Sequence, residues 1–278
     1  MKFFFIRFAV PATLLFFLGS CSVQDHLIPV TSCHIIEEVY QNASILGGPP
    51  KSPTETLDID GIKVPIGITD HRQYEYDNQG RVSRVVFVPV PEALVKGRTD
   101  TFEYATNQVI QTITLPDGTK EKSTFKLNEF GSWDLSANTY DADGFVIRTK
   151  VAYSTGKEWF EDGVDEYTIE GGNIIKSIST RPQNGFTFTT LYEYDLSKPN
   201  VPVIYSFYAR TSKNLPTKII SYQGPIGASY RSEQEYRYVF DQNGQVKRRI
   251  EISNSYTTDG TKYLPTRYVV TDYTITCQ

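Results

Sequence analysis

The sequence predicts an all-β protein, an antiparallel meander of β-hairpins that forms one large curved or rolled sheet. The composition favours strands, because 19 Tyr and 16 Phe accompany a single Met in 278 residues, and aromatic side chains suit a pleated, half-buried surface. No window after residue 30 keeps an apolar period of 3.6 residues for three turns, so little or no helix is expected outside the first residues. Short turn signals also follow one another closely along the chain.

The clearest turn signal is the stretch YEYDNQGRV at residues 74–82. Tyr74 and Tyr76 are two positions apart, which puts both rings on one face of an extended segment. Asp77 supplies a side-chain acceptor that opens a tight turn, and Gly80 supplies the positive φ that closes it. The stretch therefore predicts a strand, a turn and a returning strand.

This pattern returns at irregular intervals, as internal repeats do. The core Tyr-Asp-x-x-Gly occurs again at residues 140–144, with Phe in the tyrosine position at 240–244, and as a weaker copy at 167–172. A branched apolar residue lies two positions after the last glycine of each copy, so the returning strand is expected to start in a fixed register. The turn glycines expected to have positive φ are Gly80, Gly144, Gly172 and Gly244.

The rest of the chain divides at other turn signals. A first strand is expected at 33–40 and a small hairpin at 57–64, separated by a Gly- and Pro-rich loop at 46–53. Roughly fifteen strands result, joined by short connections that favour antiparallel pairing between neighbours in sequence. The proline-containing joints at 198–202 and 214–216 predict edge strands or loops.

The first twenty residues have the profile of a signal peptide. Lys2 and Arg7 come before or within the start of an apolar run that reaches Leu18, and this run is shorter than the about 20 residues of a comfortable membrane span. The following LGSC at residues 18–21 resembles the lipobox of bacterial lipoproteins, in which the cysteine receives the lipid. An ordinary secretory leader with a chance cysteine is the alternative.

The expected organisation is a signal peptide at 1–20, a lipid-anchored tether at 21–32 with the lipid on Cys21, and a single β domain at 33–278. The protein is then an outer-membrane lipoprotein that faces the periplasm or the cell exterior. Removal of the leader leaves 26 Lys and Arg against 32 Asp and Glu, a net charge of −6. This charge disfavours nucleic acid as a partner.

The repeated unit Tyr-x-Tyr-Asp-x-x-Gly-(Arg)-(Val/Ile) resembles the YD repeat of RHS-type proteins. Its combination with a lipobox resembles the YD-like lipoproteins of unknown function found in Bacteroidota. The copies at Tyr76, Tyr140 and Phe240 match best, although their spacing is irregular and only the first keeps the arginine after the glycine. The resemblance implies a curved run of hairpins and a role in surface contact or carbohydrate binding rather than catalysis.

The sequence contains no pattern typical of a catalytic or metal site. The three histidines, His26, His34 and His71, are isolated from one another, and neither a nucleophile elbow nor a phosphate-binding loop occurs. We therefore expect a non-enzymatic binding or structural protein without a cofactor or metal. Its expected partners are the membrane, through the lipid, and a glycan or an envelope protein.

Trp159 is the candidate ligand contact. It lies in the stretch EWFED at residues 158–162, where acidic neighbours favour a surface position, and aromatic faces stack on sugar rings. The alternative is a half-buried strand residue beside an acidic turn. A glycan hydrolase that uses paired carboxylates is the alternative function, because such an enzyme needs only two suitably spaced acids.

Two cysteines remain once Cys21 is assigned to the lipid. Cys33 lies in the first expected strand and Cys277 in the last. An even pair in an oxidising compartment predicts a disulfide between them. Two buried free thiols are the alternative.

Overall fold

A computed structural model describes residues 33–43, 52–93, 96–154, 158–224 and 230–277. The signal peptide, Cys21, His26 and the tether lie outside these residues. The described strands are β1 Cys33–Asn42, β2 Glu55–Ile59, β3 Ile62–Tyr76, β4 Val82–Phe87, β5 Arg98–Ala105, β6 Gln108–Thr114, β7 Lys120–Lys126, β8 Asn138–Tyr140, β9 Val146–Ser154, β10 Trp159–Glu170, β11 Asn173–Arg181, β12 Phe186–Pro199, β13 Asn214–Gln223, β14 Arg231–Phe240, β15 Val246–Tyr256 and β16 Arg267–Cys277. Two short 3-10 helices accompany them, η2 Pro91–Ala93 and η3 Pro182–Asn184.

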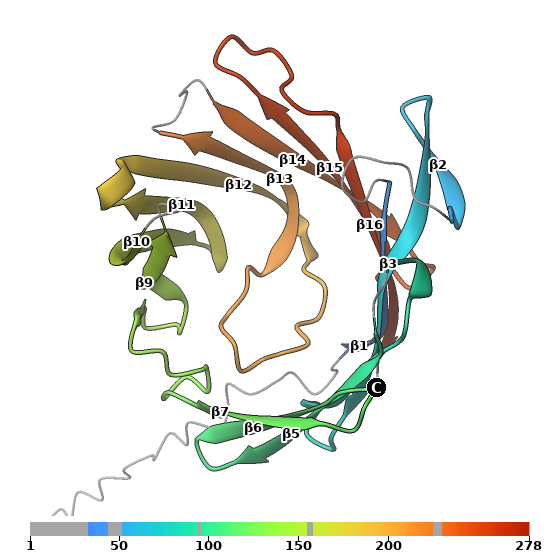
Figure 1. Cartoon of the computed structure of the whole chain (residues 1–278), viewed down its shortest axis with the longest axis vertical. Helices are drawn as coiled ribbons and strands as arrows, with labels where there is room; N and C mark the ends of the chain where they lie inside the picture. The colour runs from blue at the N-terminus through green and yellow to red at the C-terminus, as the bar shows by residue number, and fades with distance from the viewer. Residues whose placement is uncertain (1–32, 44–51, 94–95, 155–157, 225–229, 278) are drawn as a thin grey trace, which may run out of the picture. The chain divides into compact units, whose positions relative to one another are not determined.

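These sixteen strands form one curved antiparallel sheet, which confirms the predicted fold class (Figure 1). Its order is β7-β6-β5-β4-β3-β1-β16-β15-β14-β13-β12-β11-β10-β9-β8, with β2 paired to β3 beside this path. Neighbours in sequence are therefore neighbours in the sheet except at β1, which lies between β3 and β16. The edges are β7 and β8, two strands that follow one another in the chain, so the sheet is not closed.

The pairing of β1 with β16 places Cys33 opposite Cys277, and the two form a disulfide. The bond joins residues 244 positions apart, across strands that no local turn connects. It covalently links the first and last strands of the described sheet.

The repeated turns share one hydrogen-bond pattern. In the first, Asp77 Oδ1 accepts from the backbone N–H groups of Gln79 and Arg81 at 2.9 and 3.0 Å, while the N–H of Gly80 donates to the Asp77 carbonyl. Asp141 and Asp241 repeat these side-chain bonds in their own turns. A type I turn closed by a glycine with positive φ explains this arrangement.

The turn glycines all have positive φ, at 73° for Gly80, 83° for Gly144, 80° for Gly172 and 78° for Gly244. The register shifts beside each of these turns. The shift lies between Glu75 and Tyr76 in the first copy, at the equivalent positions of the copies at Tyr140 and Phe240, and one residue later, between Thr168 and Ile169, in the weaker copy. A β-bulge of this kind bends the strand and increases its local twist beside the turn. Sequence reasoning missed one further turn of the same kind, at residues 128–132, where Asn128 replaces the aspartate.

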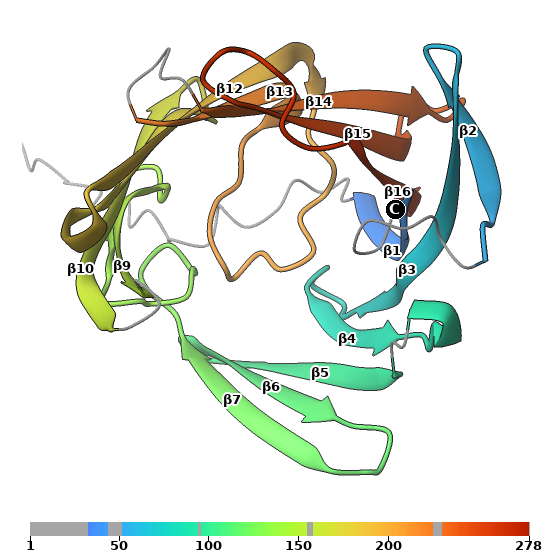
Figure 2. The same ribbon diagram turned by 45° about the horizontal axis from the view of Figure 1, so that its top comes forward.

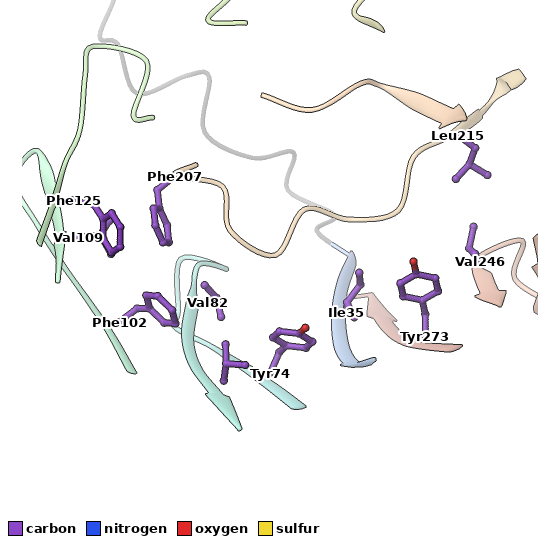
Figure 3. Packing of buried hydrophobic residues seen from close by; sticks show 11 residues of the cluster. Ile35, Tyr74, Val82, Phe102, Val109, Phe125, Phe207, Leu215, Val246 and Tyr273 are labelled. Atoms are coloured by element: carbon purple, nitrogen blue, oxygen red, sulfur yellow. The ribbon is translucent and has the colours of Figure 1, made fainter. Parts of the chain in front are cut away.

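The main core lies on the inner, concave face of the sheet. It joins residues of β1, β3, β4, β5, β6, β7, β13, β15 and β16 to residues 200–213, the connection between β12 and β13, which we call the inner segment (Figure 2). Phe207 of this segment is 2% exposed and packs against Phe102 and Phe125, with ring centroids 5.8 and 5.5 Å apart (Figure 3). The backbone N–H of Trp133 donates to the Phe207 carbonyl. The inner segment is therefore hydrogen-bonded to the connection that follows β7.

A second core lies on the outer face, beneath the hairpin of β2 and β3. Ile59, Val64 and Ile66 of the hairpin pack with Ile252 and Val270 of β15 and β16. Ion pairs connect the hairpin to the strands below it, from Arg237 to Asp60 and from Arg248 to Glu55.

The structure corrects the prediction for the second proline-containing joint. Pro216 lies in β13, an internal strand, opposite Tyr194 of β12. The register shifts between Glu193 and Tyr194 at this position, and an irregularity of this kind accommodates a residue that has no N–H to donate.

Candidate functional site

Trp159 is the first residue of β10 and is 78% exposed. It pairs with Ser154 of β9, and the next residue, Phe160, directs its ring toward Tyr153 at a centroid distance of 5.7 Å. Asp162 accepts a hydrogen bond from the side chain of Gln183 at 2.9 Å, which connects this hairpin end to η3. The structure therefore places the predicted contact residue at the surface, near the turn between β11 and β12.

Further aromatic side chains are exposed at the same end of the sheet. Phe186 and Phe188 at the start of β12 are 43% and 37% exposed, and their ring centroids are 6.2 Å apart. Tyr263 is 59% exposed, and its ring lies edge-on to that of Tyr230 at 6.1 Å. We call these four side chains, together with Trp159, the aromatic end.

A pocket of about 460 Å³ lies within the aromatic end. Phe186 and Tyr230 contribute to its wall, together with Thr187, Gln223 and Thr258. The N–H of Gly224 donates to the carbonyl of Thr187 at 2.6 Å, so the strand ends around the pocket are held together. The mixture of ring faces and polar groups suits a ligand with both apolar and hydroxyl surfaces.

The sequence points to Trp159 but not to the other four rings of the aromatic end. The turn Asn184-Gly185 is visible in the sequence, and Phe186 and Phe188 alternate with threonine after it. Such alternation predicts two rings on one face. It does not show that the face is exposed, because the tertiary packing decides this.

A second pocket, of about 330 Å³, carries three glutamates, Glu193, Glu233 and Glu235. Glu233 accepts from Arg231 at 2.9 Å and lies 3.8 Å from Lys218. Glu235 accepts from Arg237 at 3.0 Å. These pairings engage both carboxylates with basic side chains of the same sheet, which favours a structural or binding role for the two residues.

Polar groups also lie within the inner face. Glu38 is 5% exposed and accepts hydrogen bonds from the hydroxyls of Tyr40 and Tyr74 at 2.9 and 2.5 Å. Burial, reinforced by the Glu38 carboxylate, raises the pKa of both phenols above its ordinary value. Burial likewise raises the pKa of Tyr273 to about 12, so these three hydroxyls remain protonated donors at neutral pH.

The described residues contain no group of three or more His, Cys, Asp and Glu side chains placed to hold a metal ion. His71 Nε2 donates to Glu37 Oε1 at 2.8 Å, and this hydrogen bond lowers the pKa of Glu37 despite opposing burial. In the same part of the chain, no helix has the length and hydropathy needed to cross a bilayer.

Comparison with protein-family models gives no match, and comparison with curated proteins gives none either. Among solved structures, the chain is similar to a porin-like protein from Bacteroides uniformis ATCC 8492, with a TM-score of 0.50 and 15% identity over 87% of this chain and 98% of that one. A porin-like protein from Bacteroides vulgatus ATCC 8482 gives a TM-score of 0.28 and 10% identity over the same shares. The first likeness shows a shared all-β fold.

Proposed function

We propose that this chain is a non-catalytic, lipid-anchored protein of the bacterial envelope that binds carbohydrate at its aromatic end. The observation that carries this proposal is the 460 Å³ pocket, whose wall includes Phe186 and Tyr230, at the end of the sheet where Trp159, Phe188 and Tyr263 are also exposed. The envelope location rests on the LGSC motif at residues 18–21 and is supported by the porin-like description of the Bacteroides uniformis protein that shares the fold.

The chemistry of the outer face favours a sheet in water, with lipid at Cys21 as the attachment. Glu75 and Arg84 form an ion pair of 2.6 Å on this face, and their side chains are 59% and 44% exposed. Arg237 and Asp60 form another at 2.8 Å. Arginine or lysine facing lipid costs about 2–4 kcal/mol at the bilayer midplane, whereas these exposed pairs are well solvated in water.

Aromatic faces suit a carbohydrate that carries little charge. A sugar ring presents C–H groups on one face and hydroxyls around its edge, so it stacks on Phe or Trp while its hydroxyls reach polar groups such as Gln223 and Thr258. Covering one ring contributes about 1–3 kcal/mol, so several rings are needed for useful affinity. The resemblance to YD repeats also supports a surface role of this kind.

A glycan array tests the proposal with the soluble protein that starts at Ser22. The native protein is expected to retain glycans that are lost by Phe186→Ala and weakened by Trp159→Ala. Phe240→Ala is the matched control, since Phe240 is 37% exposed but lies at the turn between β14 and β15, at the opposite end of those strands. If the folded native protein retains no glycan, carbohydrate is not its ligand and a structural or protein-binding role remains.

A glycan hydrolase remains the second candidate because three glutamates border the 330 Å³ pocket. Glycans that the array identifies are incubated with the native protein and with Glu233→Gln and Glu235→Gln. Product formation that either variant abolishes supports hydrolysis. Binding without product, unchanged in both variants, supports the non-catalytic proposal.

A further inference from the structure

Most arginines in the described part of the chain have a carboxylate partner. Nine arginines form such pairs, namely Arg72, Arg81, Arg84, Arg98, Arg148, Arg181, Arg231, Arg237 and Arg248. Arg210 and Arg267 have no such pair and are exposed to solvent. Arg249 is different, because it is half-buried and none of the described carboxylates lies within ion-pair distance of it.

Arg249 lies on the inner face of β15, opposite Tyr238 of β14 and Thr271 of β16. Its guanidinium donates one hydrogen bond, to the hydroxyl of Thr271 at 3.3 Å. The guanidinium carbon lies 5.9 Å from the centre of the Tyr273 ring. A guanidinium carries five N–H donors, so most of its donors have no acceptor among the described residues.

The acidic groups that face Arg249 from the surrounding strands are already engaged. Glu251, two positions further along β15, accepts from the hydroxyl of Ser253 at 3.0 Å. Glu38 of β1 accepts from the two phenols of Tyr40 and Tyr74. The hydroxyl of Tyr238 donates to the Pro216 carbonyl at 2.7 Å, so it offers no negative charge.

We propose that Arg249 anchors a binding site for an oxyanion, a carboxylate or a sulfate, on the inner face of β14, β15 and β16. Removing a cation from water costs free energy unless an anion accompanies it. The planar guanidinium matches a carboxylate or sulfate with two parallel hydrogen bonds. The ring of Tyr273 and the hydroxyl of Thr271 contact the guanidinium, and its other donors remain for such a ligand.

This site is separate from the aromatic end and does not depend on it. The rings of the aromatic end lie in the turns and strand ends at one end of the sheet, whereas Arg249 is the fourth residue of β15, near the turn at 241–244. Arg249 therefore favours a ligand with a negatively charged group, such as an acidic sugar, on the inner face. Neutral sugars carry no negative charge that could pair with Arg249.

Isothermal titration of the purified protein tests the site with four probes: sodium glucuronate, sodium sulfate, glucose and sodium chloride, the three salts at equal ionic strength. The native protein is expected to bind glucuronate or sulfate, and neither glucose nor chloride. Binding by glucuronate alone identifies a sugar-borne carboxylate, and equal binding of sulfate identifies a general oxyanion site. Both results support the proposal.

Arg249→Lys keeps the positive charge but loses the planar pair of N–H donors. Its affinity for the anion should therefore fall by about tenfold to a hundredfold. Arg249→Met should abolish binding, and circular dichroism establishes that both variants are folded.

Arg81→Gln is the matched control, since Arg81 also lies over a tyrosine ring, at 4.1 Å from Tyr104, but is paired with Asp77. The proposal is overturned if the native protein binds neither anion or if Arg249→Met binds as the native does. Phe186→Ala should leave anion binding unchanged, which separates this site from the carbohydrate proposal.

Discussion

The hydroxyl of Tyr104 donates a hydrogen bond of 2.9 Å to the backbone carbonyl of Val82. Val82 is the residue two positions after the turn glycine of the preceding hairpin, and the pairing of β4 with β5 starts only at Arg84. Its carbonyl therefore lies beyond the end of the ladder, where an unpaired backbone acceptor needs a partner. The tyrosine of one hairpin supplies that partner for the hairpin before it.

The same relation recurs along the sheet. The hydroxyls of Tyr140 and Tyr194 donate to the carbonyls of Trp133 and Ile174, at 3.0 and 2.7 Å. Each acceptor again lies two positions after a turn glycine, Gly131 or Gly172. The repeated tyrosine thus connects successive hairpins as well as packing against the core, which gives its recurrence in the sequence a physical reason.

Tyr104→Phe should destabilise the protein by about 1 kcal/mol, because it leaves the Val82 carbonyl without its donor. The free energy of unfolding in urea measures the effect. Tyr263→Phe is the control, since this tyrosine is 59% exposed and its substitution should leave stability unchanged. Equal stability of native protein and Tyr104→Phe would show that water replaces the lost bond.

Gly144→Ala should cost more stability than Gly244→Ala. Both glycines have positive φ, which alone costs a residue with a side chain about 1–3 kcal/mol. A Cβ at Gly144 also meets the ring of Phe130 at 3.0 Å, whereas a Cβ at Gly244 meets nothing within 4 Å. Thermal unfolding of the two variants gives the comparison, and an equal loss would mean that Phe130 moves aside without cost.

Reduction of the disulfide between Cys33 and Cys277 should lower the stability. For a loop of 244 residues, the chain-entropy model gives about 5 kcal/mol as an upper value. The melting temperature should fall in dithiothreitol for the native protein and be insensitive to it in the double variant Cys33→Ser, Cys277→Ser. A native melting temperature that reductant leaves unchanged while the thiols become alkylatable contradicts the stabilising role.

The turn at Asp77 should contribute stability that depends on pH. Burial raises the pKa of Asp77, but hydrogen bonds from the Arg81 side chain and from backbone N–H groups outweigh it and lower the pKa below its usual value. A lowered pKa in the folded state stabilises the protein above the unfolded value of about 3.9. This contribution disappears as the pH falls through the folded pKa.

Asp77→Asn keeps the acceptor for the backbone and loses the charge. Native protein should be the more stable of the two at about pH 6, and the difference should disappear as the pH falls through the lowered folded pKa of Asp77. Urea unfolding at several pH values measures it. A difference that stays constant over this range would assign the role of Asp77 to hydrogen bonding rather than to its charge.

Cys21→Ala should release the protein from membranes into the soluble fraction, because the substitution removes the proposed site of lipid attachment. Fractionation of expressing cells measures this, with mass spectrometry of the N-terminus of the native protein. Continued membrane association of the variant, together with an unmodified native N-terminus, would exclude lipidation at Cys21.

The features that the sequence alone determined are local. Asp77 and Gly80 make a turn with residues at most four positions away, so the turn can be predicted without knowledge of the fold. The fixed offset between each turn glycine and the next branched residue sets the register of the returning strand for the same reason. The acidic neighbours of Trp159 also indicated its surface position correctly.

Tertiary structure alone decided the features that join distant parts of the chain. No local signal inserts β1 between β3 and β16, because that pairing depends on hydrogen bonds across most of the chain length. Phe207 lies in a connection yet is buried, since the concave sheet leaves it facing Phe102 and Phe125. Arg249 resembles any strand arginine in the sequence. That none of the described carboxylates pairs with it follows only from the side chains that folding places around it.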